Sequence, residues 1–189
     1  MRRVSTPMDE TTVRELRAGE TIFLTGNMVT ARDKAHLRAL RMKDAGEGVV
    51  AFQGATVYHC GPIVSGEGES MEIVAAGPTT SARMNMLAPR AIRELGIRAV
   101  IGKGGMSKET HEAMVESGCV YLAATGGAAV TLAEGIERIV SREWEDLGMA
   151  ESLWTLQVRD FGPLVVAMDS HGRSLYREVE ESVKRNAGI

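Results

Sequence analysis

Short apolar runs alternate with amphipathic segments along most of this 189-residue chain. Runs rich in apolar and β-branched residues predict strands, and apolar positions three or four residues apart predict helices. The predicted strands cover residues 21–25, 49–52, 56–59, 71–76, 99–101, 120–124, 156–158 and 164–168. One predicted helix begins after Thr30, and four others cover residues 81–95, 108–117, 128–140 and 178–186. This alternation predicts an α/β fold in which helices flank a parallel or mixed sheet.

The two ends of the chain carry weaker patterns. Residues 1–10 are polar, and we expect them to be flexible. Residues 169–172 have the composition of a turn, which predicts antiparallel pairing near the C-terminus, with 174–176 extending the sheet. Because no linker, repeat or low-complexity segment interrupts the pattern, we expect residues 1–189 to form a single domain.

Composition and charge narrow the classes of partner. The formal net charge is -3, so neither nucleic acid nor an anionic membrane surface is favoured. No apolar run approaches the length of a membrane span. Arg2 and Arg3 are not followed by the apolar segment of a secretory signal. The expected location is therefore the cytoplasm.

The cysteines and histidines do not form a metal-binding pattern. There are two cysteines, Cys60 and Cys119, and neither belongs to a Cys-x-x-Cys pair. Cys119 opens an apolar run, which favours packing as a small hydrophobic residue. Cys60 follows His59, and this pair is compatible with a metal site or with a structural role; the small number of ligands favours the structural role. We therefore predict no metal ligand in this chain.

The run Gly77-Pro78-Thr79-Thr80-Ser81-Ala82-Arg83 carries the first sign of chemistry. A strand, a Gly-Pro turn, hydroxyl side chains and a helix start together direct backbone N–H groups toward an anion. Arg83 would lie in the first helical turn, where the helix dipole disfavours a cation unless an anionic ligand is bound. The alternative is that Arg83 pairs with a surface carboxylate such as Glu94 or Glu72.

Cations recur at other junctions between a strand and a helix. Arg32 follows Thr30, the expected cap of its helix, and Lys103 lies in the loop Gly102-Lys103-Gly104-Gly105 after a short strand. A further junction, Thr125-Gly126-Gly127, offers bare backbone N–H groups. Because ligands bind at the carboxyl ends of parallel strands, we expect these junctions to converge on a pocket for a ligand with two carboxylates. The alternative is a set of solvated, glycine-rich loops without a ligand.

These motifs together resemble the beta subunit, or C-terminal domain, of the iron–sulfur hydro-lyases that include class I fumarases and L-tartrate dehydratases. The resemblance covers about residues 18–176. It is carried by the order and spacing of Leu24-Thr25-Gly26, Thr30-Ala31-Arg32-Asp33-Lys34-Ala35-His36, His59-Cys60-Gly61-Pro62, Gly77 to Met84, Gly102-Lys103-Gly104 and Ala123-Ala124-Thr125-Gly126-Gly127-Ala128-Ala129. It implies a swivelling β/β/α domain, with a mixed sheet or small barrel flanked by helices.

The resemblance also implies roles for individual residues. Thr79 matches the proposed general base, while Arg32, Arg83 and Lys103 match residues that hold substrate carboxylates or support that base. Thr80 is then a cap or packing residue. His36, His59, Gly126 and Gly127 are candidates for the border of the pocket. Ala82 and Asn85 stand where many relatives have Gly and Asp, which leaves the exact substrate open.

The resemblance implies that half of the active site is missing from this chain. In the family a [4Fe–4S] cluster acts as the Lewis acid, and its cysteine ligands belong to the alpha part. We therefore expect an alpha subunit as partner in an α2β2 assembly, and no activity from this chain alone.

Three functional interpretations follow. The first is a subunit for the reversible hydration of fumarate to L-malate, and the second is the dehydration of L-tartrate to oxaloacetate; both substrates need the same cations. The third is a stand-alone phosphate- or nucleotide-binding module. It is weaker, because Ser107 stands where G-x-G-x-x-G requires its last glycine and the chain contains no Walker A motif.

Overall fold

The computed structural model describes residues 1–187 of the chain. The α-helices are α1 (Glu10–Glu15), α2 (Asp33–Asp44), α3 (Ala88–Leu95), α4 (Lys108–Ser117), α5 (Ala129–Glu134) and α6 (Leu175–Ala187). The strands are β1 (Arg2–Thr6), β2 (Thr21–Thr30), β3 (Thr56–Tyr58), β4 (Ile63–Ser65), β5 (Glu72–Ala75), β6 (Ala99–Gly102), β7 (Val120–Ala123), β8 (Ile136–Glu143) and β9 (Leu153–Met168). Four short 3-10 turns are η1 (Val50–Phe52), η2 (Gly68–Ser70), η3 (Ser81–Met84) and η4 (Glu145–Leu147).

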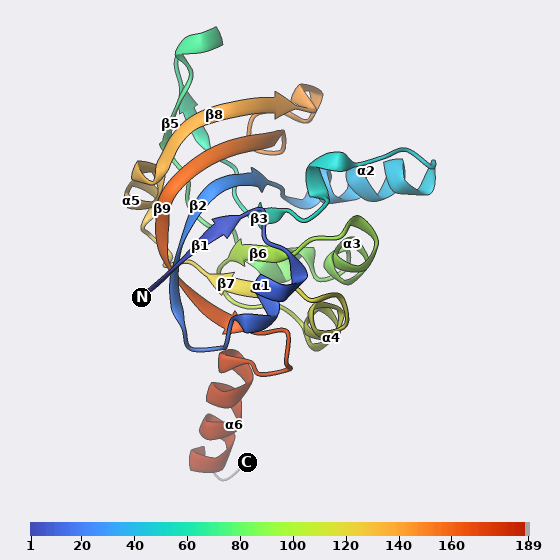
Figure 1. Ribbon diagram of the computed structural model, residues 1–189, viewed down its shortest axis with the longest axis vertical. Coiled ribbons are helices and arrows are strands. Elements are labelled where there is room, and N and C mark those ends of the chain that lie inside the picture. The colour runs from blue at the N-terminus through green and yellow to red at the C-terminus, as the bar shows by residue number, and fades with distance from the viewer. Residues whose placement is uncertain (188–189) are drawn as a thin grey trace.

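Five strands close into a small mixed barrel (Figure 1). The sheet order is β1-β2-β3-β6-β7-β9-β8, and β2 also pairs with β9, which joins the two sides. β2, β3, β6 and β7 run parallel, whereas β9 is antiparallel to both β2 and β7. β1 and β8 extend the sheet beyond the closed part. The carboxyl ends of the four parallel strands therefore meet at one edge of the barrel.

The barrel strands are buried on both faces, which explains their continuous apolar sequences. Tyr58, Ile101 and Leu122 belong to the core inside the barrel. Their neighbours Val57, Val100 and Tyr121 belong to a second core on the outside. In Figure 1, α2, α3 and α4 cover this outer side of the barrel. Two apolar layers therefore hold the sheet, one enclosed by it and one between it and the helices.

Local signals set the ends of the covering helices. The side-chain oxygen of Ser107 accepts a hydrogen bond from the Thr110 backbone N–H at the start of α4. Gly118, just past its end, adopts the left-handed conformation that favours glycine. Gly96 ends α3 in the same way.

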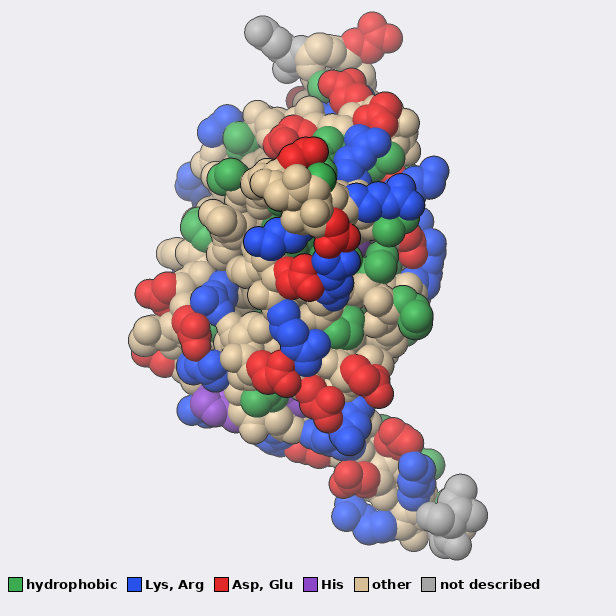
Figure 2. Space-filling model, turned by 90° about the vertical axis from the view of Figure 1, so that its right-hand side faces the viewer, with side chains coloured by type: hydrophobic (Ala, Val, Ile, Leu, Met, Phe, Trp, Pro, Cys, Tyr) green, Lys and Arg blue, Asp and Glu red, His purple; other side chains and the backbone are tan. Residues whose placement is uncertain are grey.

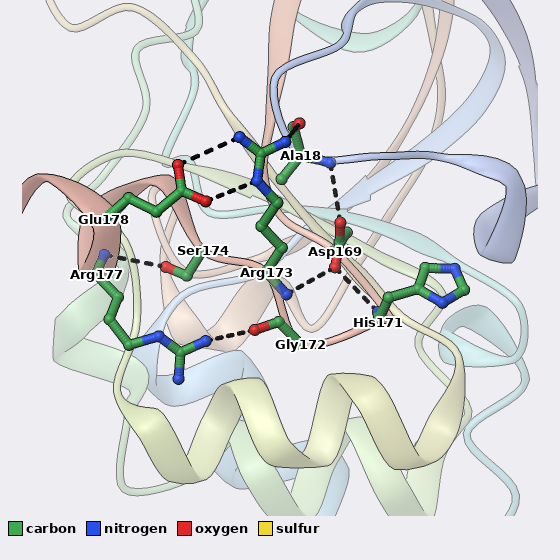
Figure 3. Close-up of polar contacts among 8 residues, drawn as sticks. All are labelled: Ala18, Asp169, His171, Gly172, Arg173, Ser174, Arg177 and Glu178. Carbon is green, nitrogen blue, oxygen red and sulfur yellow. Dashed lines mark hydrogen bonds and ion pairs between the residues drawn. The ribbon is translucent and has the colours of Figure 1, made fainter.

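Three parts project from the barrel in Figure 1. β8 and the first half of β9 rise on one side, the β4–β5 hairpin lies beside them, and α6 extends from the opposite end. α6 follows a tight turn after β9. In this turn the Asp169 carboxylate accepts hydrogen bonds from the backbone N–H groups of Ala18, His171 and Arg173 (Figure 3).

The predicted fold class is confirmed, since the structure is a mixed α/β barrel flanked by helices. The expectation of a flexible segment at residues 1–10 is wrong. Arg2–Thr6 forms β1 and pairs in parallel with β2, and Glu10–Glu15 forms α1. The polar residues lie on an edge strand, where one face needs no apolar side chain.

Several predicted element types or boundaries are also wrong. Residues 49–52 contain a 3-10 turn instead of a strand. The helix predicted over 81–95 is split into η3 and α3, because Pro89 favours the first turn of a new helix. The helix predicted over 128–140 ends at Glu134 before Gly135, and β8 follows. Residues 174–176 enter α6 after a single bridge between Met168 and Ser174.

The predicted strands near the C-terminus are parts of one element. Residues 156–158 and 164–168 both lie in β9, which is 16 residues long. Asp160 within it has a φ of 47°, and the register against β2 shifts nearby. This irregularity explains why the pattern looks like two strands.

The surface carries both signs of charge. Figure 2 shows Lys and Arg interspersed with Asp and Glu on the face that lies to the right in Figure 1. Charged side chains elsewhere in the protein form pairs of opposite sign, as Arg38 does with Asp146 and Arg93 with Glu116. None of the helices in the described part of the chain has the length and apolar character needed to cross a bilayer.

Candidate functional site

The segment from Pro78 to Ser81 lies between the carboxyl ends of β3 and β6. On one side Pro78 forms an antiparallel bridge with Cys60, and on the other Thr80 forms a parallel bridge with Lys103. β3 and β6 pair only as far as Tyr58 and Ile101. The inserted segment continues the sheet beyond this point.

Thr79 and Lys103 are held together by this arrangement. The Thr79 backbone N–H donates to the His59 carbonyl at 2.7 Å, and the Lys103 N–H donates to the Thr79 carbonyl at 3.4 Å. The Ser81 N–H donates to the Lys103 carbonyl at 3.0 Å. Thr79 is half-buried and Lys103 is exposed. A hydroxyl and a primary ammonium are thus presented from neighbouring backbone positions at an open edge.

Arg32 precedes α2 at the end of β2, but Thr30 does not cap this helix as expected. Arg32 itself is the N-cap residue and makes no side-chain cap bond. The Thr30 hydroxyl instead accepts a hydrogen bond from the Trp154 N–H, within the barrel wall. The Arg32 Nε lies 3.5 Å from Glu151 Oε1 without making a hydrogen bond. A Cβ at Gly61 would be 2.8 Å from the Arg32 guanidinium, so this glycine makes room for the side chain.

Arg83 lies in η3 and not in the first turn of an α-helix, because the predicted helix begins later. Its guanidinium donates to Asp33 Oδ2 at 2.7 Å, which links η3 to the first turn of α2. Arg83 thus pairs with a carboxylate, as the alternative interpretation expected, but the partner is Asp33 and not Glu94 or Glu72. Glu94 pairs with Arg90. Arg83 stays half-exposed. It therefore lies near the start of α2, as Arg32 does.

Two histidines form a buried layer beneath the edge. His36 on α2 places Nδ1 3.0 Å from the Arg32 carbonyl, and its ring meets that of His59 with centroids 5.2 Å apart. His59 Nδ1 lies 2.8 Å from Ser81 Oγ, and the Tyr121 hydroxyl donates to the same oxygen. Burial lowers the pKa of His36 below its ordinary value, and burial followed by the charge of His36 lowers the pKa of His59 well below it.

The glycine loop after β7 lies close to Lys103. A Cβ at Gly126 would be 3.8 Å from Lys103 Cδ, and Gly127 has a φ of +83°. The helix that follows, α5, has only six residues and no side-chain cap. Asn85 points elsewhere, since its side-chain oxygen accepts a hydrogen bond from the Ser107 N–H.

The structure thus brings Arg32, Arg83, Lys103 and Thr79 to one edge, with His36 and His59 beneath and Gly126 beside Lys103. Sequence reasoning missed the supporting residues Asp33, Glu151, Ser81 and Tyr121 as parts of the site. Asp33 lies in the first turn of α2, where an acidic residue is common. Its position one residue after Arg32 offered no sign of a pair with Arg83, which lies 50 residues away.

The residues of this chain do not fit an iron–sulfur cluster. Burial raises the pKa of Cys60 to about 12, against an opposing effect of the Arg32 charge, and burial likewise raises the pKa of Cys119 to about 12. Both thiols are buried, and a cluster ligand must be a thiolate. Among residues 1–187 no group of three or more His, Cys, Asp or Glu side chains is placed to hold a metal ion.

The fold and the cations at one barrel edge define an α/β barrel protein with a positively charged polar site. The chain belongs to the family described as Fumarase C-terminus, whose model matches residues 2–179. This confirms the resemblance found in the sequence motifs.

Individual relatives agree with this assignment. A Methanocaldococcus jannaschii protein, provisionally named L(+)-tartrate dehydratase subunit beta, is 43% identical over 173 residues, which cover 90% of this chain and 89% of that protein. The Escherichia coli K12 L(+)-tartrate dehydratase subunit beta is 38% identical over 93% of this chain and 86% of its own length. A Geobacillus stearothermophilus protein, provisionally named class I fumarate hydratase, is 42% identical over 96% of this chain but only 35% of its own length.

Proposed function

We propose that this chain is the beta subunit of a hydro-lyase that acts on a C4 dicarboxylate, with the reversible hydration of fumarate to L-malate as the first candidate reaction. The observation that carries the proposal is the meeting of Arg32, Arg83, Lys103 and Thr79 at one barrel edge. L-Tartrate dehydration to oxaloacetate is the second candidate. It is favoured by the near-full-length match to relatives named as tartrate dehydratase beta subunits.

The cations suit a substrate with two carboxylates. A guanidinium carries five N–H donors, and the contact with Asp33 involves one nitrogen of Arg83, so other donors are left for a carboxylate. Lys103 is exposed at the same edge and supplies a point charge. In this proposal Arg32 and Arg83 bind the carboxylates, and Lys103 binds substrate and lowers the energy of negative charge near Thr79.

Thr79 is assigned the proton transfer. In the dehydration direction the deprotonated Thr79 oxygen takes the proton from the carbon next to a carboxylate and becomes the hydroxyl; in the hydration direction the hydroxyl gives that proton back to the carbon and becomes the alkoxide again. A threonine hydroxyl is weakly acidic, so this role depends on the neighbouring cations stabilising the alkoxide. The backbone bonds on both sides of Thr79 supply the fixed geometry that the transfer needs.

A partner subunit would complete the site. The edge is open, and exposed apolar residues occur along the same segments: Met86 is 90% exposed, Val130 64% and Met149 45%. Exposed apolar side chains around a polar centre are typical of an interaction surface. We propose an alpha subunit that carries a [4Fe–4S] cluster, in an α2β2 assembly, and that this chain is inactive alone. The cluster would supply a Lewis acid for the substrate hydroxyl.

The proposal is tested by reconstitution with a cluster-bearing alpha subunit under anaerobic conditions. Fumarate, L-malate and L-tartrate are assayed side by side, and the faster substrate decides between the two candidate reactions. Thr79→Ala should keep assembly and cluster absorbance but lose at least about 100-fold in kcat, the scale of a lost general base. Thr80→Ala, which changes the adjacent exposed threonine, is the matched control and should stay within about 3-fold of the unsubstituted enzyme. Substantial hydration of fumarate by this chain alone, metal-free, would contradict the split site.

A further inference from the structure

A chain of buried polar groups lies directly beneath Thr79 and Lys103. The Tyr121 hydroxyl donates to Ser81 Oγ at 3.0 Å, and Ser81 Oγ lies 2.8 Å from His59 Nδ1. Ser81, His59 and Tyr121 are all fully buried. Hydrogen bonds between buried groups hold their partners in place, because breaking one leaves a polar group unpaired away from water.

Ser81 is the middle member of these polar groups. Its oxygen accepts the hydroxyl proton of Tyr121, and His59 Nδ1 lies within hydrogen-bonding distance of the same oxygen. Burial keeps the His59 imidazole uncharged. The second ring nitrogen of His59 is Nε2. That atom is buried, makes no hydrogen bond and belongs to the ring packed against His36.

The buried groups Tyr121, Ser81 and His59 are connected to the site through the backbone. The His59 carbonyl accepts the Thr79 N–H, and the Ser81 N–H donates to the Lys103 carbonyl. Both ends of the segment Thr79–Ser81 are thus tied to the strand ends that carry them. Gly102 is part of the fit, since a Cβ there would be 1.9 Å from Ser81 Oγ.

We propose that Ser81 and His59 are positioning residues, which fix the Thr79 hydroxyl and the Lys103 ammonium by locking the segment between β3 and β6 to the layer below it. The inference rests on the proposed function of Thr79 and Lys103. It goes beyond that function by assigning the precision of the site to a buried Tyr–Ser–His chain that does not touch the substrate.

The first test compares Ser81→Ala with Ser174→Ala in the reconstituted enzyme. Ser174 is also a buried serine, but it bridges to Met168 at the end of β9, and this end of β9 lies beside the start of β2, opposite the site. Ser81→Ala should lower kcat at least about 10-fold and leave KM within about 3-fold, because the carboxylate-binding arginines are unchanged. Ser174→Ala should leave both parameters within about 2-fold. An unchanged kcat in Ser81→Ala, or an equal loss in Ser174→Ala, would overturn the proposal.

A second pair of variants separates hydrogen bonding from packing at His59. Asn places an amide group where Nδ1 lies, so His59→Asn can still form a hydrogen bond with Ser81 as donor or acceptor, whereas His59→Leu fills more of the ring volume without a hydrogen-bonding group. We expect His59→Asn to retain at least about 5-fold more kcat than His59→Leu. Equal activity, or higher activity in His59→Leu, would reduce His59 to a packing residue.

Amide hydrogen exchange of the isolated chain tests the positioning without any enzyme assay. The Thr79 and Ser81 amides should exchange at least about 10-fold faster in Ser81→Ala than in the unsubstituted chain, and at an unchanged rate in Ser174→Ala. If the reconstituted enzyme turns over neither fumarate nor tartrate, the proposed function fails. The amide exchange rates then test the positioning role of Ser81 on their own. An unchanged exchange rate of the Thr79 amide in Ser81→Ala would reject that role.

Discussion

Arg83 shows how a single side chain can link two elements and still face a ligand. Its contact with Asp33 ties η3 to α2, yet the side chain keeps about half of its surface exposed. A lysine at this position would keep the charge, but it could not hold Asp33 and a carboxylate in the same plane.

We therefore predict that Arg83→Lys lowers kcat/KM of the reconstituted enzyme by an amount equivalent to about 2–5 kcal/mol of transition-state binding. Arg90→Lys is the matched control, since Arg90 on α3 is a partly exposed arginine that pairs with Asp44 at the end of α2 and with Glu94 on α3. It should change kcat/KM less than about 2-fold. Near-normal turnover in Arg83→Lys, with assembly intact, would make Arg83 a structural ion-pair residue only.

Asp169, unlike Arg83, makes all of its described contacts within the protein interior and the turn that it belongs to. The carboxylate accepts three backbone N–H groups in the turn between β9 and α6 (Figure 3), and these bonds outweigh burial to lower its pKa. Asp169→Ala leaves the buried Ala18 N–H without a partner. We predict a loss of about 3 kcal/mol in the free energy of unfolding, measured by urea denaturation.

Glu178 provides the control from the same cluster. It pairs with Arg173 at the surface, with both side chains about half exposed. Glu178→Ala should therefore lower the free energy of unfolding by less than about 1 kcal/mol. If the two variants had the same free energy of unfolding, the Asp169 carboxylate would not be what stabilises this turn.

At the scale of elements, α6 stands apart from the rest of the fold. None of the described residues of α6 is buried, and Val179 and Val183 are 63% and 58% exposed. Its first turn contacts the body through Leu175, which packs against the outer core, and through Tyr176, whose ring lies 6.1 Å from that of Tyr121. We predict that ending the chain after Glu178 shifts Tm by less than about 2 °C in a thermal melt. A larger fall would show that the rest of the helix packs on the barrel in solution.

The elements also show what sequence patterns can predict. Residues 99–101, 120–124 and 108–117 were assigned correctly, because buried strands and a capped helix have strong local signals. β1 was missed, since its polar residues acquire a strand partner only through β2. Residues 128–140 have helical spacing throughout, yet the second half pairs with β9, so tertiary contacts override local preference.

The site was predictable to a similar degree. Thr79 follows a proline, Lys103 lies between two glycines and Arg32 lies just past a strand end, and these local features marked them. Arg83 was marked by the hydroxyl side chains that precede it. Ser81 and Tyr121 carry no such mark. Their hydrogen bond joins residues 40 positions apart, and only the closed barrel brings them together.

For the molecule as a whole, the buried histidines predict a loss of stability in mild acid. The pKa of His59 is lowered well below the ordinary value by burial, and that of His36 is lowered in the same direction. The unfolded chain therefore binds protons first, so this stability is complete above about pH 6.5 and is lost as the pH falls toward the folded-state pKa. Between pH 7.5 and 5.5, His59 alone should remove about 1.4 kcal/mol from the free energy of unfolding.

Urea denaturation at several pH values would measure this slope, and His59→Asn is the comparison because Asn does not titrate. The variant is expected to have a lower free energy of unfolding at pH 7.5, but this free energy should fall by a smaller amount between pH 7.5 and 5.5. A slope unchanged by the substitution would mean that His59 becomes protonated within the folded protein.

The closure of the barrel by β2 and β9 has a consequence for how the protein acquires its shape. The Trp154 N–H meets the Thr30 hydroxyl across 124 residues of chain, so the last wall of the barrel depends on contacts between distant segments. Chains dominated by such pairings fold slowly, because loop-closure entropy must be overcome before the contacts form. The helices α3 and α4 and the strands β6 and β7 can assemble locally. Arg32, at the end of β2, reaches its neighbours only when the barrel is closed. During refolding, recovery of the site should therefore lag behind recovery of helical circular dichroism.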